Sequence, residues 1–194
     1  MKLPVIRQIH STSSMEEINH TITVLENISE VSSIKGEELD VIGELISNLC
    51  GAIEVHELVE TGMSPKDALN AFMKKLRNEV KAIKSNVMLT MSPSPFPWGR
   101  DEYLQDWPTW VDSGWVDAIL PQCYRYDIAA YNATIAQQKG YYKNPAVAFY
   151  PGVLLKVGNN VTSGSLLNQM IQTNRNNGFK GECFFFYEGI KDQI

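Results

Sequence analysis

Residues 87–187 alternate short apolar runs with helical stretches, and this alternation limits the folds that the chain can adopt. Each run is apolar on both faces, as strands buried between two layers of helices are. An order of strand, helix and strand predicts parallel strands that are joined by right-handed crossovers. The predicted strands are 87–92, 118–124, 146–150 and 182–187, and the predicted helices between them are 104–113, 129–139 and 165–176.

The first 75 residues show only the helical period. Ser14 is followed three residues later by Glu17, which predicts the N-terminal cap of a helix that runs to about residue 28. A long amphipathic helix follows it. Ser64 and Pro65 then predict the N-cap and first position of a third helix, whose apolar stripe continues to about residue 85.

Composition changes near residue 75. Residues 1–75 carry 6 basic and 12 acidic side chains and no Trp or Tyr, whereas residues 76–194 carry 11 basic and 10 acidic side chains and every Trp and Tyr. No Gly/Ser-rich or Pro-rich linker separates the two parts, so we expect them to be rigidly coupled. We therefore predict an all-helical segment over residues 1–75 and an α/β part over residues 76–194.

Charge and motifs exclude several classes of function. A net charge of −5 gives no basic surface for nucleic acid, and no run of about 18 apolar residues is available to span a membrane. The three Cys and three His share no metal-ligand spacing, and no nucleotide-binding motif is present, so we expect neither a metal nor a cofactor. The sequence as written begins without an export signal, which leaves its localisation open.

All four tryptophans lie within residues 92–126, beside prolines and a charged loop. Two interpretations of this segment stay open, because aromatic side chains stack on sugar rings in ligand clefts but also fill ordinary cores. Polar and aromatic side chains also follow the ends of the predicted strands, where the loops of a parallel α/β fold converge. The predicted substrate-binding residues there are Trp98, Arg100, Gln122, Tyr124, Tyr150 and Tyr187.

Glu188 and Asp127 are the predicted catalytic residues, since glycoside hydrolysis uses a pair of carboxyl groups. Glu188 directly follows the last predicted strand, where burial would raise its pKa toward that of a general acid. The alternative for Glu188 is a surface position in the turn before Gly189. Asp127 could equally cap the helix that begins near residue 129, which is the commoner use of Asp at such a position.

Three segments of the second part carry a resemblance to a known family. VKAIKSNVMLTMSPSPFPWGR, YLQDWPTWVDSGWVDAILPQCYRYD and GFKGECFFFYEGI resemble, in this order, a glycoside-hydrolase-like barrel family of bacterial secreted proteins related in fold to family 10 glycosidases. The resemblance covers about residues 76–190 and implies strands five to eight of a TIM-type barrel. It also implies a carbohydrate-active protein whose partner is an oligosaccharide or polysaccharide, in a family that is typically exported.

Residues 1–74 resemble a different, short and uncharacterised bacterial family, and they stand where a full barrel would have its first four strands. We therefore expect a glycoside hydrolase that is incomplete and weakly active or inactive alone. The alternative is a non-catalytic carbohydrate-binding or protein-interaction module. Four parallel strands leave two unpaired edges. Either the N-terminal helices cover part of the open sheet, which we favour, or two chains pair their edges in a homo-oligomer.

Overall fold

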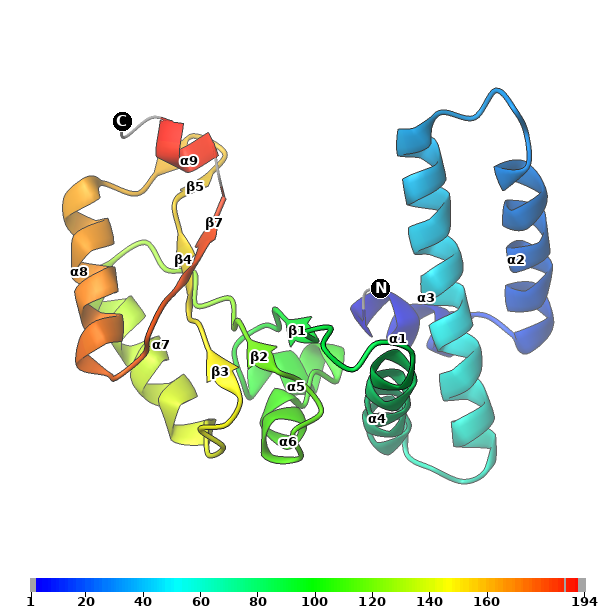
Figure 1. The fold of residues 1–194 in the computed structure, drawn as a ribbon, viewed down its shortest axis with the longest axis horizontal. Coiled ribbons are helices and arrows are strands. Elements are labelled where there is room, and N and C mark those ends of the chain that lie inside the picture. The colour runs from blue at the N-terminus through cyan, green and yellow to red at the C-terminus, as the bar shows by residue number, and fades with distance from the viewer. Residues whose placement is uncertain (1–2, 187, 192–194) are drawn as a thin grey trace. The chain divides into compact units, whose positions relative to one another are not determined.

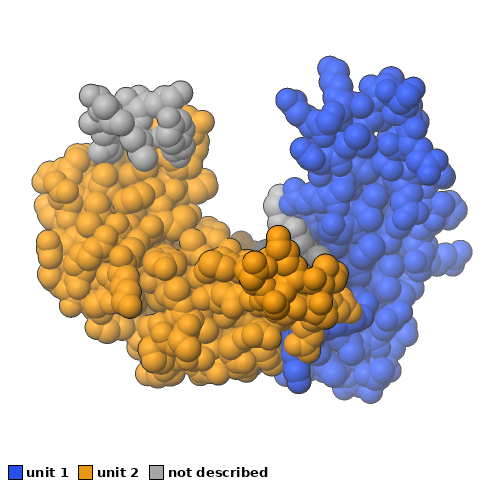
Figure 2. Space-filling model, in the orientation of Figure 1, with its two compact units in different colours: residues 1–76 blue, residues 77–194 orange. Residues whose placement is uncertain are grey.

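The computed structural model describes residues 3–186 and 188–191 (Figure 1). The chain divides into two compact units, residues 1–76 and 77–194, which Figure 2 shows in blue and orange. The boundary falls inside helix α4 (Pro65–Ile83). All strands among the described residues belong to the second unit, so the division separates a helical part from a mixed α/β part.

The first unit consists of α1 (Leu3–Thr12), α2 (Met15–Ser29), α3 (Gly36–Glu60) and the first part of α4. The cap predicted for α2 is confirmed: the Ser14 hydroxyl accepts from the Glu17 N–H, and the Ser14 N–H donates to the Glu17 carboxylate at 2.8 Å. The predicted start of α4 is confirmed as well, because the Ser64 hydroxyl accepts from the backbone N–H of Asp67 at 3.2 Å.

The core of the first unit forms where α1 approaches α3 closely. A glycine, Gly51, makes this approach possible, because a Cβ at that position would lie 2.6 Å from Cδ1 of Ile6. Burying each large aliphatic side chain there contributes about 1.5–3 kcal/mol. The buried apolar residues of this unit are Ile6, Ile18, Leu49, Ala52, Val55, Ala68, Leu69, Phe72 and Met73.

The second unit contains parallel strands, as the sequence predicts. β1 (Thr90–Met91) pairs with β2 (Ala118–Ile119), and β2 pairs with β3 (Ala148–Phe149). β4 (Gly152–Leu154) pairs with β7 (Cys183–Phe185). The single strand predicted over 146–150 is wrong in its extent, since the chain forms β3 and β4 on either side of Pro151. A proline has no N–H to donate to a ladder, which interrupts the strand.

The predicted helices between the strands are confirmed, as α6 (Trp107–Asp112), α7 (Ile128–Tyr141) and α8 (Gly164–Asn176). Four further elements of this unit were not predicted: α5 (Trp98–Tyr103), the antiparallel pair of β5 (Lys156–Val157) and β6 (Asn160–Val161), and α9 (Glu188–Lys191). In the first unit, α1 was not predicted either. None of the helices in the described part of the chain is both long and apolar enough to cross a bilayer.

Part of the tryptophan-rich segment is core. Trp107 and Trp110 on α6 are 0% exposed, and the Trp107 ring packs edge to face against Phe96 and Phe149 at centroid distances of 6.3 and 5.8 Å. Trp98 on α5 is instead 52% exposed. The core interpretation therefore applies to Trp107 and Trp110, whereas a role for Trp98 in a ligand cleft stays a prediction.

The fully buried amide of Gln138 on α7 fixes the loop that precedes α5. Its Nε2 donates to the carbonyl of Phe96 and its Oε1 accepts from the N–H of Phe96, each at 2.8 Å. Buried backbone groups outside helices and ladders need such partners. The Gln138 amide thus satisfies both polar backbone groups of a buried loop residue, and it sets the path of the chain into α5.

Candidate functional site

The segments that follow β1 and β2 are joined by the side chain of Gln122. Its Nε2 donates to the backbone carbonyl of Ser92 at 2.9 Å, while the backbone N–H of Gln122 donates to Pro93 at the same distance. The Oε1 of Gln122 has no partner among the described residues, so it can accept a hydrogen bond from a ligand hydroxyl.

Tyr124 forms an aromatic surface with Phe185 at the carboxyl ends of β2 and β7. The two rings stack with a centroid distance of 5.1 Å and an interplanar angle of 28°. Gly152 on β4 leaves room for Tyr124, because a Cβ at Gly152 would lie 3.0 Å from the Tyr124 ring and 2.8 Å from the carbonyl oxygen of Pro121. The backbone of β4 can therefore pass close beneath the ring.

Burial raises the pKa of Tyr124 to about 12, and the nearby thiols of Cys183 and Cys123 add to the rise. The phenol is therefore protonated at neutral pH. No residue in the described ranges pairs with its hydroxyl, which leaves a hydrogen-bond donor and acceptor beside the stacked rings.

Glu188 is the first residue of α9, and its side chain is exposed. The burial predicted for its carboxylate is absent, because β7 ends at Phe185 and the chain turns into α9 instead of continuing as a covered strand. The next residue, Gly189, packs so closely that a Cβ there would lie 2.5 Å from Cβ of Leu155. The start of α9 therefore lies against the end of β4. Tyr187, a predicted substrate-binding residue, lies outside the described residues.

Asp127 lies in the loop after β2 and caps α7. Its Oδ1 accepts from the backbone N–H of Ala130 at 2.8 Å, and the side chain is exposed. This contact matches the capping interpretation of Asp127, and it orients the carboxylate toward the helix N-terminus.

The other predicted site residues occupy separate surroundings. Trp98 packs edge to face on Tyr103 at 5.0 Å, and the guanidinium of Arg100 lies 4.8 Å from the ring centroid of Phe96 and pairs with Asp101 at 2.8 Å. Within residues 3–186 and 188–191, no hydrogen bond or ring contact joins Trp98 or Arg100 to the stacked pair of Tyr124 and Phe185.

Tyr150 lines a different hollow, of about 400 Å³, beside β3. Its neighbours there are Tyr142, Pro145, Ala146, Ala148, Phe149, Gly178, Phe179 and Lys180. The Tyr150 ring lies over Gly181, where a Cβ would be 3.1 Å from the ring. The hollow thus combines aromatic walls with one cationic side chain.

A smaller hollow near the loop after β2 was missed from the sequence. It measures about 220 Å³ and is lined by Tyr126, Asn160, Val161, Thr162, Ser163 and Leu166. The β5–β6 hairpin supplies part of its wall. A sequence signal for that hairpin exists in Gly158-Asn159, a two-residue turn between Val157 and Asn160, and Gly158 indeed has φ of 55°.

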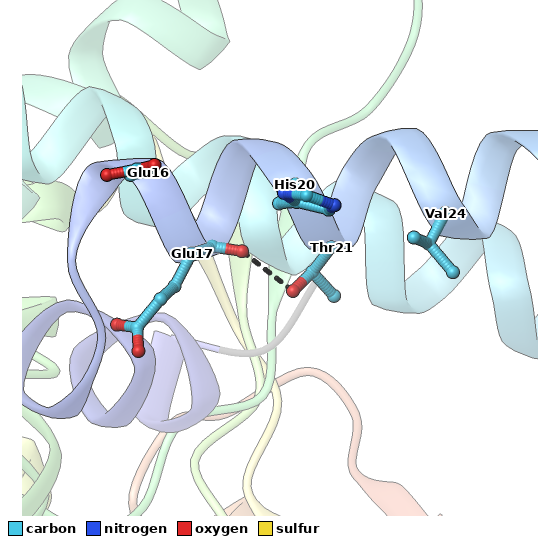
Figure 3. A pocket seen from close by; sticks show the side chains of 5 residues that line it. All are labelled: Glu16, Glu17, His20, Thr21 and Val24. Carbon is cyan, nitrogen blue, oxygen red and sulfur yellow. Dashed lines mark hydrogen bonds between the residues drawn. The ribbon is translucent and has the colours of Figure 1, made fainter.

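In the first unit, a hollow of about 400 Å³ lies along α2, where Glu16, Glu17, His20, Thr21 and Val24 project from the helix (Figure 3). One of its two carboxylates already has a hydrogen-bond partner, because the Glu17 carboxylate accepts from Ser14 in the helix cap. The described residues contain no group of three or more His, Cys, Asp or Glu that could hold a metal ion. The carboxyl ends of the strands in the second unit remain the stronger candidate site.

Residues 63–163, just over half of the chain, match the model of the family Glycosyl hydrolase-like 10. The chain belongs to this family. Residues 1–81 match a second model, a family of unknown function (DUF6952), and the two matches overlap in α4. Both resemblances seen in the sequence are therefore confirmed. No curated protein and no solved structure matches the chain significantly.

Within the Glycosyl hydrolase-like 10 match lie Gln122, Tyr124 and Asp127, whereas Phe185 and Glu188 come after it. Family membership makes the chain glycoside-hydrolase-like. It does not by itself assign a role to any of these residues, because one fold can carry many different functional sites.

Proposed function

We propose that the chain binds an oligosaccharide or polysaccharide at the carboxyl ends of its parallel strands. We also propose that residues 76–194 are the C-terminal half of a TIM-type barrel, preceded by a separate helical domain over residues 1–75. Membership in Glycosyl hydrolase-like 10 supports the carbohydrate assignment. The parallel strands with intervening helices support the barrel assignment.

The stacked pair of Tyr124 and Phe185 is the observation that carries the proposal. Sugar rings present apolar C–H faces that pack on aromatic rings, and their hydroxyls need a few well-placed polar partners. The Tyr124 hydroxyl supplies one such partner on the stacked ring itself, and we assign a second to the Oε1 of Gln122, two residues earlier in the chain. Trp98, Arg100, Tyr150 and Tyr187 are proposed as further contacts for a longer saccharide.

For catalysis, we assign the leading role to Glu188 and a secondary one to Asp127. Hydrolysis of a glycosidic bond requires two carboxyl groups that lie about 5–10 Å apart across the bond. Asp127 already caps α7, so it is poorly suited to move toward a substrate. A single chain is therefore expected to bind saccharide but to hydrolyse it weakly or not at all.

Calorimetric titration with a panel of oligosaccharides tests the binding site. Tyr124→Phe removes one hydroxyl and should weaken binding about fivefold, the equivalent of one hydrogen bond of about 1 kcal/mol. Tyr124→Ala removes the stacking surface as well and should abolish measurable binding. Gln172→Leu, on the exposed surface of α8, serves as the control and should bind like the wild type. Unchanged affinity in both Tyr124 variants would place the saccharide elsewhere.

A non-catalytic carbohydrate-binding module is the second candidate, and the exposed position of Glu188 favours it. Chromogenic glycosides separate the two functions. Loss of hydrolysis in Glu188→Gln, with binding retained, would support the catalytic assignment. Binding by the wild type without any turnover would support the non-catalytic module.

A further inference from the structure

One edge of the parallel sheet is β1, and its backbone offers unpaired groups. On the side of β2, the carbonyl of Leu89 accepts from Asp117 and the carbonyl of Met91 accepts from Leu120, both at 2.8 Å. Successive residues of a strand direct their polar backbone groups to opposite sides. The N–H and C=O of Thr90 therefore point away from β2, and no described residue pairs with them.

The other edge is β7, and its backbone also has an N–H and a C=O that point away from the neighbouring strand. Toward β4, the N–H of Cys183 donates to Pro151 at 3.1 Å, and the carbonyl of Phe185 accepts from Leu155 at 2.6 Å. Phe184 lies between these two bonded residues, so its N–H and C=O face the free side. Among the described residues they have no partner.

Backbone hydrogen bonds connect the strands between these two edges. The N–H groups of Tyr150 and Gly152 donate to the carbonyls of Ile119 and Pro121, at 3.0 and 2.8 Å. Both β3 and the start of β4 therefore lie beside the segment that contains β2. The three-stranded sheet β1-β2-β3 and the two-stranded sheet β4-β7 are thus linked through the segment that carries β3 and β4, and four chain segments run in one direction with β1 at one end and β7 at the other.

Aromatic side chains gather at the β7 edge. Phe184, Phe185 and Phe186 are 39%, 42% and 37% exposed. Phe185 stacks on Tyr124 in the proposed saccharide site, so it is left out of the interface. Because a phenylalanine side chain buries about 200 Å² when covered, pairing at this edge would bury about 150 Å² of Phe184 and Phe186 per chain. A stable interface uses about 800 Å² per partner, so these two rings would supply about a fifth of it.

We propose that a second copy of this chain closes the sheet, with β1 of each copy pairing in parallel with β7 of the other. Four segments from each copy give eight, the number that closes a TIM-type barrel. A two-fold axis along the barrel relates the copies and makes both junctions identical, as expected for an isologous dimer. A helix laid over the open sheet would cover a face but would leave the edge groups of Thr90 and Phe184 unpaired.

This arrangement would also complete the site, a consequence that rests on the proposed function. The carboxyl ends of all eight strands would open at the same mouth of the barrel. Glu188 of one copy would then lie across the two-fold axis from the same residue of the second copy. The two carboxyl groups that hydrolysis requires would come from two chains, one from each.

Light scattering after size-exclusion chromatography tests the dimer. The wild type should have twice the chain mass of 21.8 kDa. Thr90→Pro removes an edge N–H and Phe184→Lys places a charge at the opposite edge, and each should give a monomer. Val157→Lys is the matched control, since Val157 is 42% exposed but lies on the β5–β6 hairpin; it should stay dimeric. A monomeric wild type, or edge variants that remain dimeric, would overturn the proposal.

Hydrogen exchange of the wild type gives a second readout that needs no variant. The amides of Thr90 and Phe184 should be protected at high protein concentration and should exchange faster on dilution. Rapid exchange of both amides at every concentration would contradict edge pairing, even if the chain were dimeric through another surface.

Mixing experiments separate this inference from the proposed function. In co-refolded mixtures of wild type and Glu188→Gln, hydrolysis should fall with the square of the wild-type fraction, because each site needs two Glu188 carboxylates. A linear fall would refute the shared site. If no glycoside is hydrolysed at all, the catalytic assignment fails, while chain mass and amide exchange still decide whether the barrel-closing dimer exists.

Discussion

Replacing Gln138 with methionine should destabilise the second unit by about 2–6 kcal/mol. Methionine keeps nearly the same volume and remains compatible with helix α7. It removes both hydrogen bonds to Phe96, which is only 8% exposed. Each buried backbone group left without a partner costs about 1–3 kcal/mol, and the substitution leaves two of them.

Urea unfolding followed by tryptophan fluorescence measures this loss directly. All four tryptophans lie within residues 77–194, so the signal reports the second unit alone. The free energy of unfolding falls by about 2 kcal/mol for each molar of urea. The urea concentration at the midpoint of unfolding should therefore fall by about 1–3 M. The slope of the transition should be unchanged if the variant still unfolds in one step.

Gln172→Met is the matched control for this experiment. Gln172 lies exposed on α8, and its Nε2 donates to the side chain of Asn176 at 2.9 Å, so its replacement should cost less than about 0.5 kcal/mol. Equal midpoints for the two methionine variants would refute the reasoning. The loop before α5 would then hold its path without the Gln138 amide.

Three other substitutions or reagents test separate features. The ion pair of Asp117 with Lys81, at 2.8 Å, lowers the pKa of Asp117, so acidification below about pH 4 should destabilise the wild type more than it destabilises Asp117→Asn; equal urea midpoint changes between pH 7 and 3 would contradict this. Gly152→Ala places a Cβ 2.8 Å from a backbone carbonyl and should cost about 1–3 kcal/mol, so an unchanged melting temperature would show that β4 can shift. Burial raises the pKa of Cys123 to about 12, so a thiol reagent should modify exposed Cys50 at once but Cys123 only after unfolding, and rapid modification of both would show that the core opens readily.

Local signals in the sequence identified several elements correctly. The spacing of Ser14 and Glu17 predicted the start of α2, because a capping box depends only on two residues three positions apart. The parallel order of the strands followed from their alternation with helices, and this order survives even though each strand is short. Both signals are contained in contiguous stretches of chain.

Features that depend on distant contacts were not predictable. Pro151 interrupts the strand locally, but the neighbour that each half meets, β2 for β3 and β7 for β4, depends on distant contacts. The exposure of Glu188 depends on where β7 stops, which the run of apolar residues before it does not reveal. Likewise, Trp98 and Trp107 have similar local sequences rich in Pro and acidic residues, yet one is half exposed and the other is core.

The phenylalanines of β7 also affect how the newly made chain behaves. Residues 183–186 are uncharged and strongly β-forming, and in sequence they are flanked by Glu182 and Glu188, which act as gatekeepers against aggregation. In the folded chain Glu182 pairs with Arg175 at 2.7 Å, which offsets much of that protective charge. In the proposed barrel-closing dimer, a chain that has folded but has not yet paired exposes a strand edge that can also pair with other chains. The soluble yield of the chain should depend on temperature and on the rate of synthesis. Slow synthesis leaves more time for specific pairing of two chains before non-specific aggregation occurs.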